Sequence, residues 1–126
     1  MTLPRRQVLR LAAGAAALPT MLRTVRAQAY PSRPVHIVVG FAPGGPTDIA
    51  ARLIGQRLSE RLGQPFIVEN RPGAATNIAT EAVVRSPPDG YTLLAAVSSN
   101  TMNPALYTNL GFNFIRDIAM VAGIQR

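Results

Sequence analysis

The sequence predicts an α/β fold in which a β-α-β-α-β order builds a parallel sheet. Two observations carry this prediction. Short apolar runs rich in β-branched residues alternate with segments of helical periodicity. The first run, residues 35–41, is apolar almost throughout, as is typical of a strand buried on both faces. Parallel strands joined through helices take right-handed crossovers. With 126 residues, 48% of them apolar, the chain can form one small domain with a packed core.

A helix is predicted over residues 46–62, directly after the first strand and a Gly/Pro-rich turn. Gly45 suits the N-cap, and Pro46 suits the first helical position, where its missing N–H costs nothing. Asp48 falls in the first turn, where the helix dipole favours a carboxylate. Gly63 ends the helix as a C′ glycine. Apolar residues at three- and four-residue spacing predict the buried face, namely Ile49, Ala50, Leu53, Ile54, Leu58 and Leu62.

The rest of the chain continues the alternation. Further strands are predicted over residues 66–69, 91–97 and, more weakly patterned, 118–124. A short helix is predicted over residues 77–85, and one helical turn over residues 102–107. The polar residues 98–101 between them are predicted to form a loop.

Three loops are expected to meet at one edge of this sheet. They cover residues 42–47, 71–77 and 98–101, and all are rich in small and polar residues. Ligands of open α/β sheets bind at the carboxyl edge, where such loops gather. The free N–H groups of a helix's first turn, with the positive end of its dipole, favour a negative ligand there. No lysine accompanies the Gly44-Gly45 turn, so we predict a site that holds an anion without transforming it.

Composition excludes several other functions. The chain has no cysteine, and His36 is its single histidine, so no metal, no cofactor and no catalytic residue is predicted. The glycine turn lacks the Lys-Ser/Thr of a P-loop and is not G-x-G-x-x-G. Ser98 and Ser99 lack the G-x-S-x-G elbow. The net charge of +7 is concentrated in the first 29 residues. The sequence has no basic stripe with interleaved aromatics, so nucleic-acid binding is not predicted.

The first 29 residues are predicted to be an export signal. Arg5-Arg6 precede an apolar run over residues 11–18, which is too short to span a bilayer, and Ala27-Gln28-Ala29 supplies a cleavage motif. Residues 5–10 resemble the twin-arginine motif. Pro4 and Val8 depart from that motif's usual residues, which leaves the general secretory route open. We expect cleavage after Ala29; the alternative is a solvated basic tail.

Five motifs follow one another in the remaining chain. They are Y-P-S-R-P-V at 30–35, F-A-P-G-G-P-T-D at 41–48, E-N-R-P-G-A at 69–74, P-D-G-Y-T-L at 88–93 and N-P-A-L-Y at 103–107. In this order and spacing they resemble the Bug-type periplasmic solute-binding proteins of tripartite tricarboxylate transporter systems. The resemblance covers residues 30 to 124. In the family, the loop after the second strand carries more glycine than this chain does at Ala75, Thr76 and Ala79.

The resemblance implies a Rossmann-like first lobe of a Venus-flytrap fold, which captures a small organic carboxylate in the periplasm and delivers it to membrane permease subunits. It implies no enzymatic activity. Ligand contacts would come from main chain and hydroxyl groups of the carboxyl-edge loops, at Phe41, Ala42, Gly44, Gly45, Asp48, Thr76, Asn77, Ser98, Ser99 and Asn100.

Members of that family are much longer than this chain. We therefore expect residues 30–126 to be an incomplete, truncated first lobe, which binds weakly or not at all by itself. Two alternatives stay open. One is the N-terminal α/β domain of an enzyme whose catalytic residues lie beyond Arg126, and the other is a non-functional truncated product.

Overall fold

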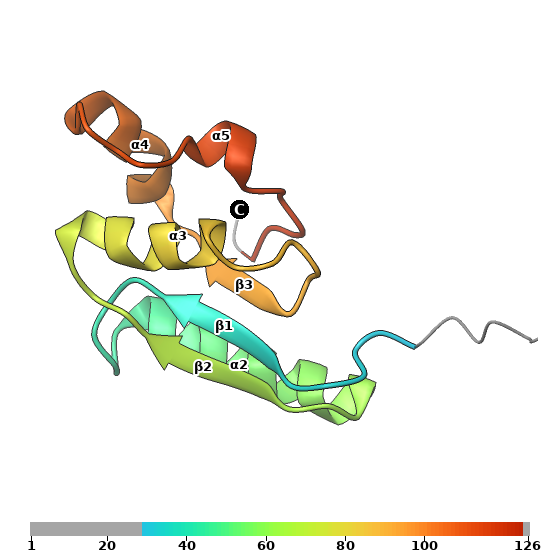
Figure 1. Ribbon diagram of the computed structural model, residues 1–126. Coiled ribbons are helices and arrows are strands. Elements are labelled where there is room, and N and C mark those ends of the chain that lie inside the picture. Colours follow the sequence, from blue (N-terminus) through green and yellow to red (C-terminus); the bar gives the residue numbers. More distant parts are fainter. Residues whose placement is uncertain (1–28, 125–126) are drawn as a thin grey trace, which may run out of the picture.

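The computed structural model describes residues 29–124 and contains a three-stranded sheet in the order β2-β1-β3 (Figure 1). The strands are β1 (Val35–Val39), β2 (Phe66–Asn70) and β3 (Thr92–Ala95). Both neighbouring pairs are parallel, so the carboxyl ends of all three strands lie at one edge. This confirms the predicted α/β class with a parallel sheet. The predicted export signal covers residues 1–29, and all of it but Ala29 lies outside the described residues.

Helices cover both faces of the sheet. Helix α2 (Pro46–Leu62) packs against β2 and β1 on one face, and α3 (Asn77–Val84) packs against β3 and β1 on the other (Figure 1). A 3-10 turn, η1 (Ala74–Thr76), leads into α3. Helix α4 (Ser98–Leu106) follows β3, and the short α5 (Phe114–Asp117) follows α4. Consequently α2, α3 and α4 all begin near the carboxyl edge of the sheet.

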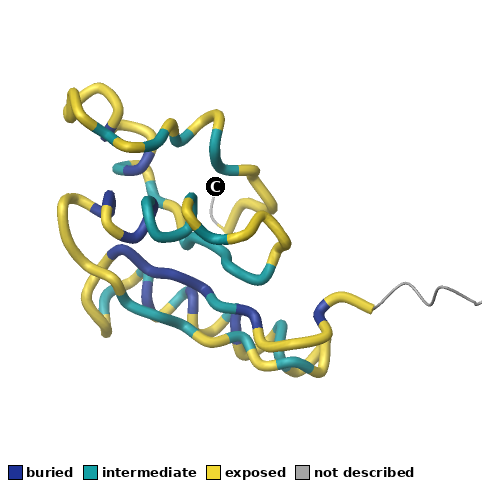
Figure 2. Tube along the Cα trace, viewed as in Figure 1, coloured by how far each residue is buried: buried dark blue, intermediate teal, exposed yellow. Residues whose placement is uncertain are grey.

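The hydrophobic core lies between the central strand and α2. Because side chains alternate along a strand, Ile37 and Val39 point to the same face and meet Ala51 of α2. Partly buried residues of the outer strands surround this cluster, namely Phe66, Val68, Leu93 and Ala95. Figure 2 shows β1 as the most continuously buried strand. The near-continuous apolar character of β1 thus reflects its central position.

The buried face of α2 differs from the predicted one. Its buried residues are Asp48, Ala51 and Gly55, whereas Ile49 and Leu53 are each 60% exposed. Small residues allow the helix to approach the sheet closely. A Cβ on Gly55 would lie 3.4 Å from the Phe66 carbonyl oxygen and 3.5 Å from Cδ1 of Ile37. Small side chains therefore make the closest contact with the sheet. Of the predicted stripe, Ala50, Ile54 and Leu58 are partly buried beside them, and Ile49, Leu53 and Leu62 are exposed.

Two further predictions about secondary structure are wrong. Residues 98–101 form the first turn of α4 and are not a loop; Asn100 stabilises this start by accepting a hydrogen bond from the N–H of Val97 at 2.7 Å. Residues 118–124 form no strand, since no described strand pairs with them, and an apolar run needs a hydrogen-bonded neighbour to become one. Helix α5 was not predicted, and Asn113 caps it through the N–H groups of Ile115 and Arg116.

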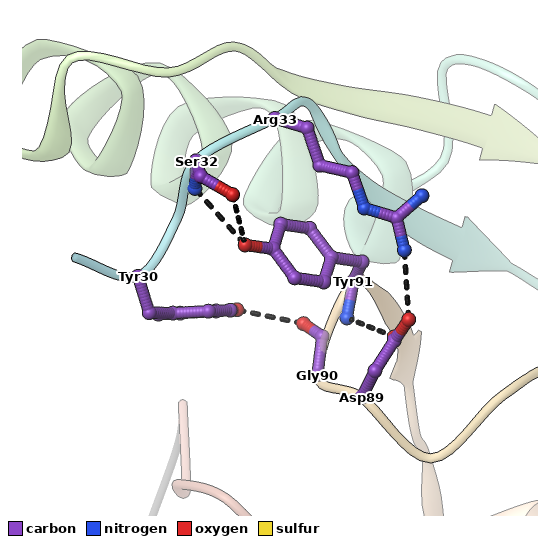
Figure 3. Close-up of polar contacts among 6 residues, drawn as sticks. All are labelled: Tyr30, Ser32, Arg33, Asp89, Gly90 and Tyr91. Atoms are coloured by element: carbon purple, nitrogen blue, oxygen red, sulfur yellow. Dashed lines mark hydrogen bonds and ion pairs between the residues drawn. The ribbon is translucent and has the colours of Figure 1, made fainter. Parts of the chain in front are cut away.

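The segment before β1 is fastened to the turn before β3, at the amino end of the sheet (Figure 3). The Tyr30 hydroxyl donates to the Gly90 carbonyl at 2.6 Å, and the Ser32 N–H donates to the Tyr91 hydroxyl at 2.9 Å. Arg33 lies 4.3 Å above the ring of Tyr91. These contacts fix the chain from Tyr30 onward at the end of the sheet away from the predicted ligand edge. Within residues 29–124 no helix is both long and apolar enough to span a bilayer.

Candidate functional site

The turn after β1 borders a hollow at the carboxyl edge of the sheet. Its volume is about 410 Å³. The residues that line it carry no ionised side chain; they are Phe41, Ala42, Pro43, Gly45, Pro46 and Thr47. Gly44, beside the hollow, has a φ of 89°, a left-handed conformation that favours glycine. Three of the predicted contact residues, Phe41, Ala42 and Gly45, are therefore brought together here.

The backbone donors of Gly45 and Thr47, at the start of α2 beside this hollow, are unpaired. Gly45 is the N-cap of α2, and the first intrahelical bond runs from the N–H of Ile49 to the Gly45 carbonyl at 3.0 Å. No side chain caps the helix, and Pro46 has no N–H to offer. Among the described residues, none accepts a hydrogen bond from the N–H of Gly45 or Thr47. These two amides, at the positive end of a 17-residue helix, can receive an anion's oxygens.

Gly44 and Asp48, also predicted to contact a ligand, offer no free group to the hollow. The Gly44 N–H donates to Oδ2 of Asp48 at 2.9 Å, so this amide is already occupied. Asp48 is only 2% exposed and does not line the hollow. Thr47 lines the hollow in their place, although the sequence did not single it out. The sequence could have indicated Thr47, because it is the first residue after Pro46 that has an N–H in the opening turn of the helix.

Asp48 belongs to a ring of three side chains, with Arg52 and Asn70, that we name the Asp48 ring. Arg52 Nε donates to Asp48 Oδ2 at 3.0 Å, and Asn70 Nδ2 donates to Asp48 Oδ1 at 2.9 Å. Arg52 Nη2 also donates to Asn70 Oδ1 at 3.0 Å, which closes the ring. Asn70 Nδ2 further donates to the Phe41 carbonyl at 3.0 Å. The ring thus ties the turn after β1 to the end of β2.

These bonds stabilise the ionised form of Asp48. The hydrogen bond from Arg52, followed by those from the Gly44 N–H and Asn70, lowers the pKa of Asp48 to about 2. The same hydrogen bond raises the pKa of Arg52. Both groups therefore remain charged throughout the physiological range.

A second group of polar side chains lies beneath the starts of α3 and α4. We name it the asparagine network; it consists of Thr76, Asn77, Thr80, Asn100 and Asn103, all buried. Asn100 Nδ2 donates to the hydroxyls of Thr76 and Thr80, each at 2.8 Å. Asn103 Nδ2 donates to Asn77 Oδ1 at 2.7 Å and to the Ala75 carbonyl at 2.6 Å. Thr76, Asn77 and Asn100, predicted to contact a ligand, are here engaged within the network and hold the two helices together.

The turn that enters α3 has an uncommon backbone. Ala74, Ala75 and Thr76 have φ values of 46°, 50° and 77°, in a region that side chains with a Cβ rarely occupy. Thr76 packs against the end of β1, because a Cβ on Gly40 would lie 2.7 Å from the Thr76 Cβ. Because Gly40 has no side chain, the side chain of Thr76 has room to pack there. The asparagine network is therefore anchored to the strand that carries the glycine turn.

The start of α4 adds two hydroxyls. Its N-cap is Val97, which has no side-chain acceptor for the first-turn amides. Ser98 is exposed, and the buried Ser99 Oγ has no hydrogen-bond partner among the described residues. The N-cap residues of α2, α3 and α4 accept no hydrogen bond with their side chains, whereas α5 is capped by Asn113; at α4 only the Val97 N–H is bonded, to Asn100. Uncapped helix starts are thus concentrated at the edge where parallel sheets bind ligands.

His36 lies on the face of the sheet that points away from α2. Its Nδ1 is 2.6 Å from Oε1 of Glu69, whose Oε2 accepts from Arg71 at 3.0 Å. The hydrogen bond with His36, and then that from Arg71, lowers the pKa of Glu69. Sequence could not show this pair, because 33 residues separate its partners and parallel pairing of β1 with β2 brings them together. Within the described part of the chain no cluster of three His, Asp or Glu residues could hold a metal ion.

Comparisons with known proteins identify relatives of this chain. Residues 50–126 match the family model of the tripartite tricarboxylate transporter family receptor. The protein BugT of Bordetella pertussis is 40% identical over 100 residues, which cover 78% of this chain and 31% of BugT. The chain spans about 30% of the length of the first curated relatives it matches.

Solved structures show the same fold. A periplasmic transporter is 49% identical and superimposes with a TM-score of 0.66, covering 70% of this chain and 30% of that one. MatC from Rhodopseudomonas palustris, solved with bound malate, is 38% identical with a TM-score of 0.63 and the same two coverages.

Proposed function

The chain belongs to the tripartite tricarboxylate transporter receptor family, and from this membership we propose that it is part of a periplasmic solute-binding protein for a small organic carboxylate. The family is one of receptors and not of enzymes, so the alternative of an enzyme domain is not retained. The observation that carries the proposal is the pair of unpaired amides, of Gly45 and Thr47, beside an uncharged hollow.

The proposed mechanism uses main-chain donors. A carboxylate enters the hollow and accepts hydrogen bonds from Gly45 and Thr47, where the dipole of α2 favours negative charge. Phe41 and Ala42 form the wall. Ser98 is exposed at the start of α4, whereas the Ser99 hydroxyl is buried and would need a local movement to reach a ligand. Malate, bound by MatC, sets the size of acid to test first. Gly44, Asp48, Thr76, Asn77 and Asn100 hold these loops in place.

We further propose the setting in which this occurs. Residues 1–29 direct export by the twin-arginine or the general secretory route, with cleavage after Ala29. Residues 30–126 contribute part of a first lobe, and a second lobe closes over the solute before delivery to membrane permease subunits. Burial by one lobe leaves part of the ligand in water, so this chain by itself should bind weakly.

Two substitutions at Gly45 test the proposal. Gly45 has a φ of −76°, which proline also adopts, so Gly45→Pro deletes one N–H at little backbone cost. Gly45→Ala is the matched control, because its Cβ would meet only the Ala42 carbonyl, at 3.8 Å, and the N–H remains. We expect L-malate to raise the melting temperature of the parent chain and of Gly45→Ala, with a smaller rise for Gly45→Pro. Malamide, its neutral diamide, should raise none of them.

Equal stabilisation of both Gly45 variants by malate would show that this amide does not hold the carboxylate. A parent chain stabilised equally by malate and malamide would show that the site does not select an anion.

A further inference from the structure

Anion binding next to Asp48 poses an electrostatic problem. The carboxylate of Asp48 is buried within one helical turn of the unpaired amides of Gly45 and Thr47, and it holds the N–H of Gly44. An uncompensated negative charge at this position repels an incoming carboxylate. We propose that Arg52 is a positioning residue of the anion site: it balances Asp48, so that this carboxylate can fix the glycine turn without opposing the ligand. The inference rests on the proposed function.

The geometry of Arg52 suits this role. It lies one turn after Asp48 on the same helix face, and its guanidinium bonds to Asp48 through Nε and to Asn70 through Nη2. Both bonds are 3.0 Å long, and they come from two nitrogens of one planar group. A lysine would supply the charge but could not make both bonds in this fixed geometry. Arg52 itself is 52% exposed, so it adds no buried charge of its own.

No other charged group of the described residues bonds to Asp48. From β2, Asn70 faces Asp48 and carries no charge. The charged residues next to it in sequence, Glu69 and Arg71, bond to each other, and Glu69 also bonds to His36 on the opposite face of the sheet. Arg52 is therefore the counter-ion of Asp48, and its removal should leave a net negative charge beneath the turn.

Three variants separate charge from structure. Arg52→Gln removes the positive charge, and Arg52→Lys keeps it. The double variant Asp48→Asn/Arg52→Gln removes both charges, while the amide oxygen at position 48 can still accept from the Gly44 N–H. If balance of charge is what matters, the affinity for L-malate should fall roughly three- to thirtyfold in Arg52→Gln. It should fall less in Arg52→Lys and recover in the double variant.

The experiment follows backbone amide resonances of the full chain in two titrations. In the first, without ligand, pH is lowered from 7 to 3 and the Gly44 amide reports on the protonation of Asp48. We expect this resonance to move little in the parent and to titrate at higher pH in Arg52→Gln. In the second, L-malate is added at pH 7, and affinity is taken from the shifts of Gly45 and Thr47.

Each outcome decides the inference. Malate affinity in Arg52→Gln equal to that of the parent would overturn it, as would a double variant that binds as weakly as Arg52→Gln. A parent chain that does not respond to malate overturns the proposed function instead. In that case the Gly44 titration decides by itself whether Arg52 controls the charge that holds the turn, and an unchanged titration in Arg52→Gln rejects this.

Discussion

The Asp48 ring and the asparagine network hold neighbouring loops at the same sheet edge with different chemistry. The ring uses an ion pair, and one of its members, Arg52, is half exposed. The network uses hydroxyls and amides only, and its residues are closed off from solvent, with Thr80 and Asn103 at most 1% exposed. Burying an ion is costly, whereas neutral groups that bond to each other lose little by leaving water. Asp48 is as buried as the network, at 2% exposed, and its charge is compensated by Arg52, which reaches solvent.

The two regions should therefore respond to different perturbations. The network should be sensitive to any lost partner and insensitive to pH, because it contains no titratable group. The ring should tolerate truncation better and respond to acid.

The largest effect is expected where the network meets β1. Gly40→Ala places a Cβ 2.7 Å from the Cβ of Thr76, and overpacking of this kind should lower the free energy of unfolding by about 3 kcal/mol. Urea denaturation measures this loss. Combining it with Thr76→Gly should recover part of it, since glycine tolerates the φ of 77° at this position. No recovery would mean that Thr76 is not what excludes a side chain from residue 40.

A smaller loss is expected for Asn103→Ala. This change leaves the side chain of Asn77 and the carbonyl of Ala75 without their buried donor, which should cost about 1–3 kcal/mol of the free energy of unfolding. The loss should be the same at pH 4 and pH 7. A loss that varies with pH would contradict the neutral character of the network.

Acid should affect the ring through Asp48. Its folded pKa of about 2 lies below the ordinary value of 3.8, so the ionised form stabilises the fold above pH about 4. This contribution is lost as pH falls from about 4 towards 2. We expect the stability difference between the parent and Asp48→Asn to be constant from pH 7 to 5 and to shrink below pH 4. A difference that persists unchanged at pH 2.5 would mean that protonation of Asp48 does not govern the ring.

The smallest effect is expected at the exposed ion pair of Arg33 with Asp89, 2.7 Å apart. Replacing Asp89 by Asn should change the free energy of unfolding by at most about 1 kcal/mol, because water screens exposed pairs. Added salt should reduce the change further. A loss as large as that of Asn103→Ala would show that the contrast between exposed and buried networks does not hold.

The sequence predicts those parts of the fold that neighbouring residues decide. The three strands of the sheet, the start of α2 at Gly45 and Pro46 and its end at Gly63 are confirmed, because each depends on turn and capping chemistry within a few residues. The buried face of α2 and the start of α4 depend on contacts between distant segments. Asn100 combines both: it accepts a local hydrogen bond from the Val97 N–H, and its bonds to the distant Thr76 and Thr80 bury its side chain.

The same distinction applies to the site. The glycine turn predicts an uncapped helix start, and the hollow lies there. The sequence does not show which amides stay free. The carboxylate of Asp48 occupies the Gly44 N–H while Arg52 and Asn70, the latter 22 residues away, hold its two oxygens. Sequence reasoning therefore could not identify the donors that a tertiary contact already occupies, and the predicted ligand contacts stay predictions.

The most direct measurement for the central claim is an amide-resolved NMR titration of the chain with L-malate at neutral pH. We predict the largest shifts at Gly45 and Thr47, a smaller response at Ser98 and Ser99, and little change at Gly44, whose N–H Asp48 already holds. The largest shift at Gly44, or shifts only at residues away from the start of α2, would contradict this claim.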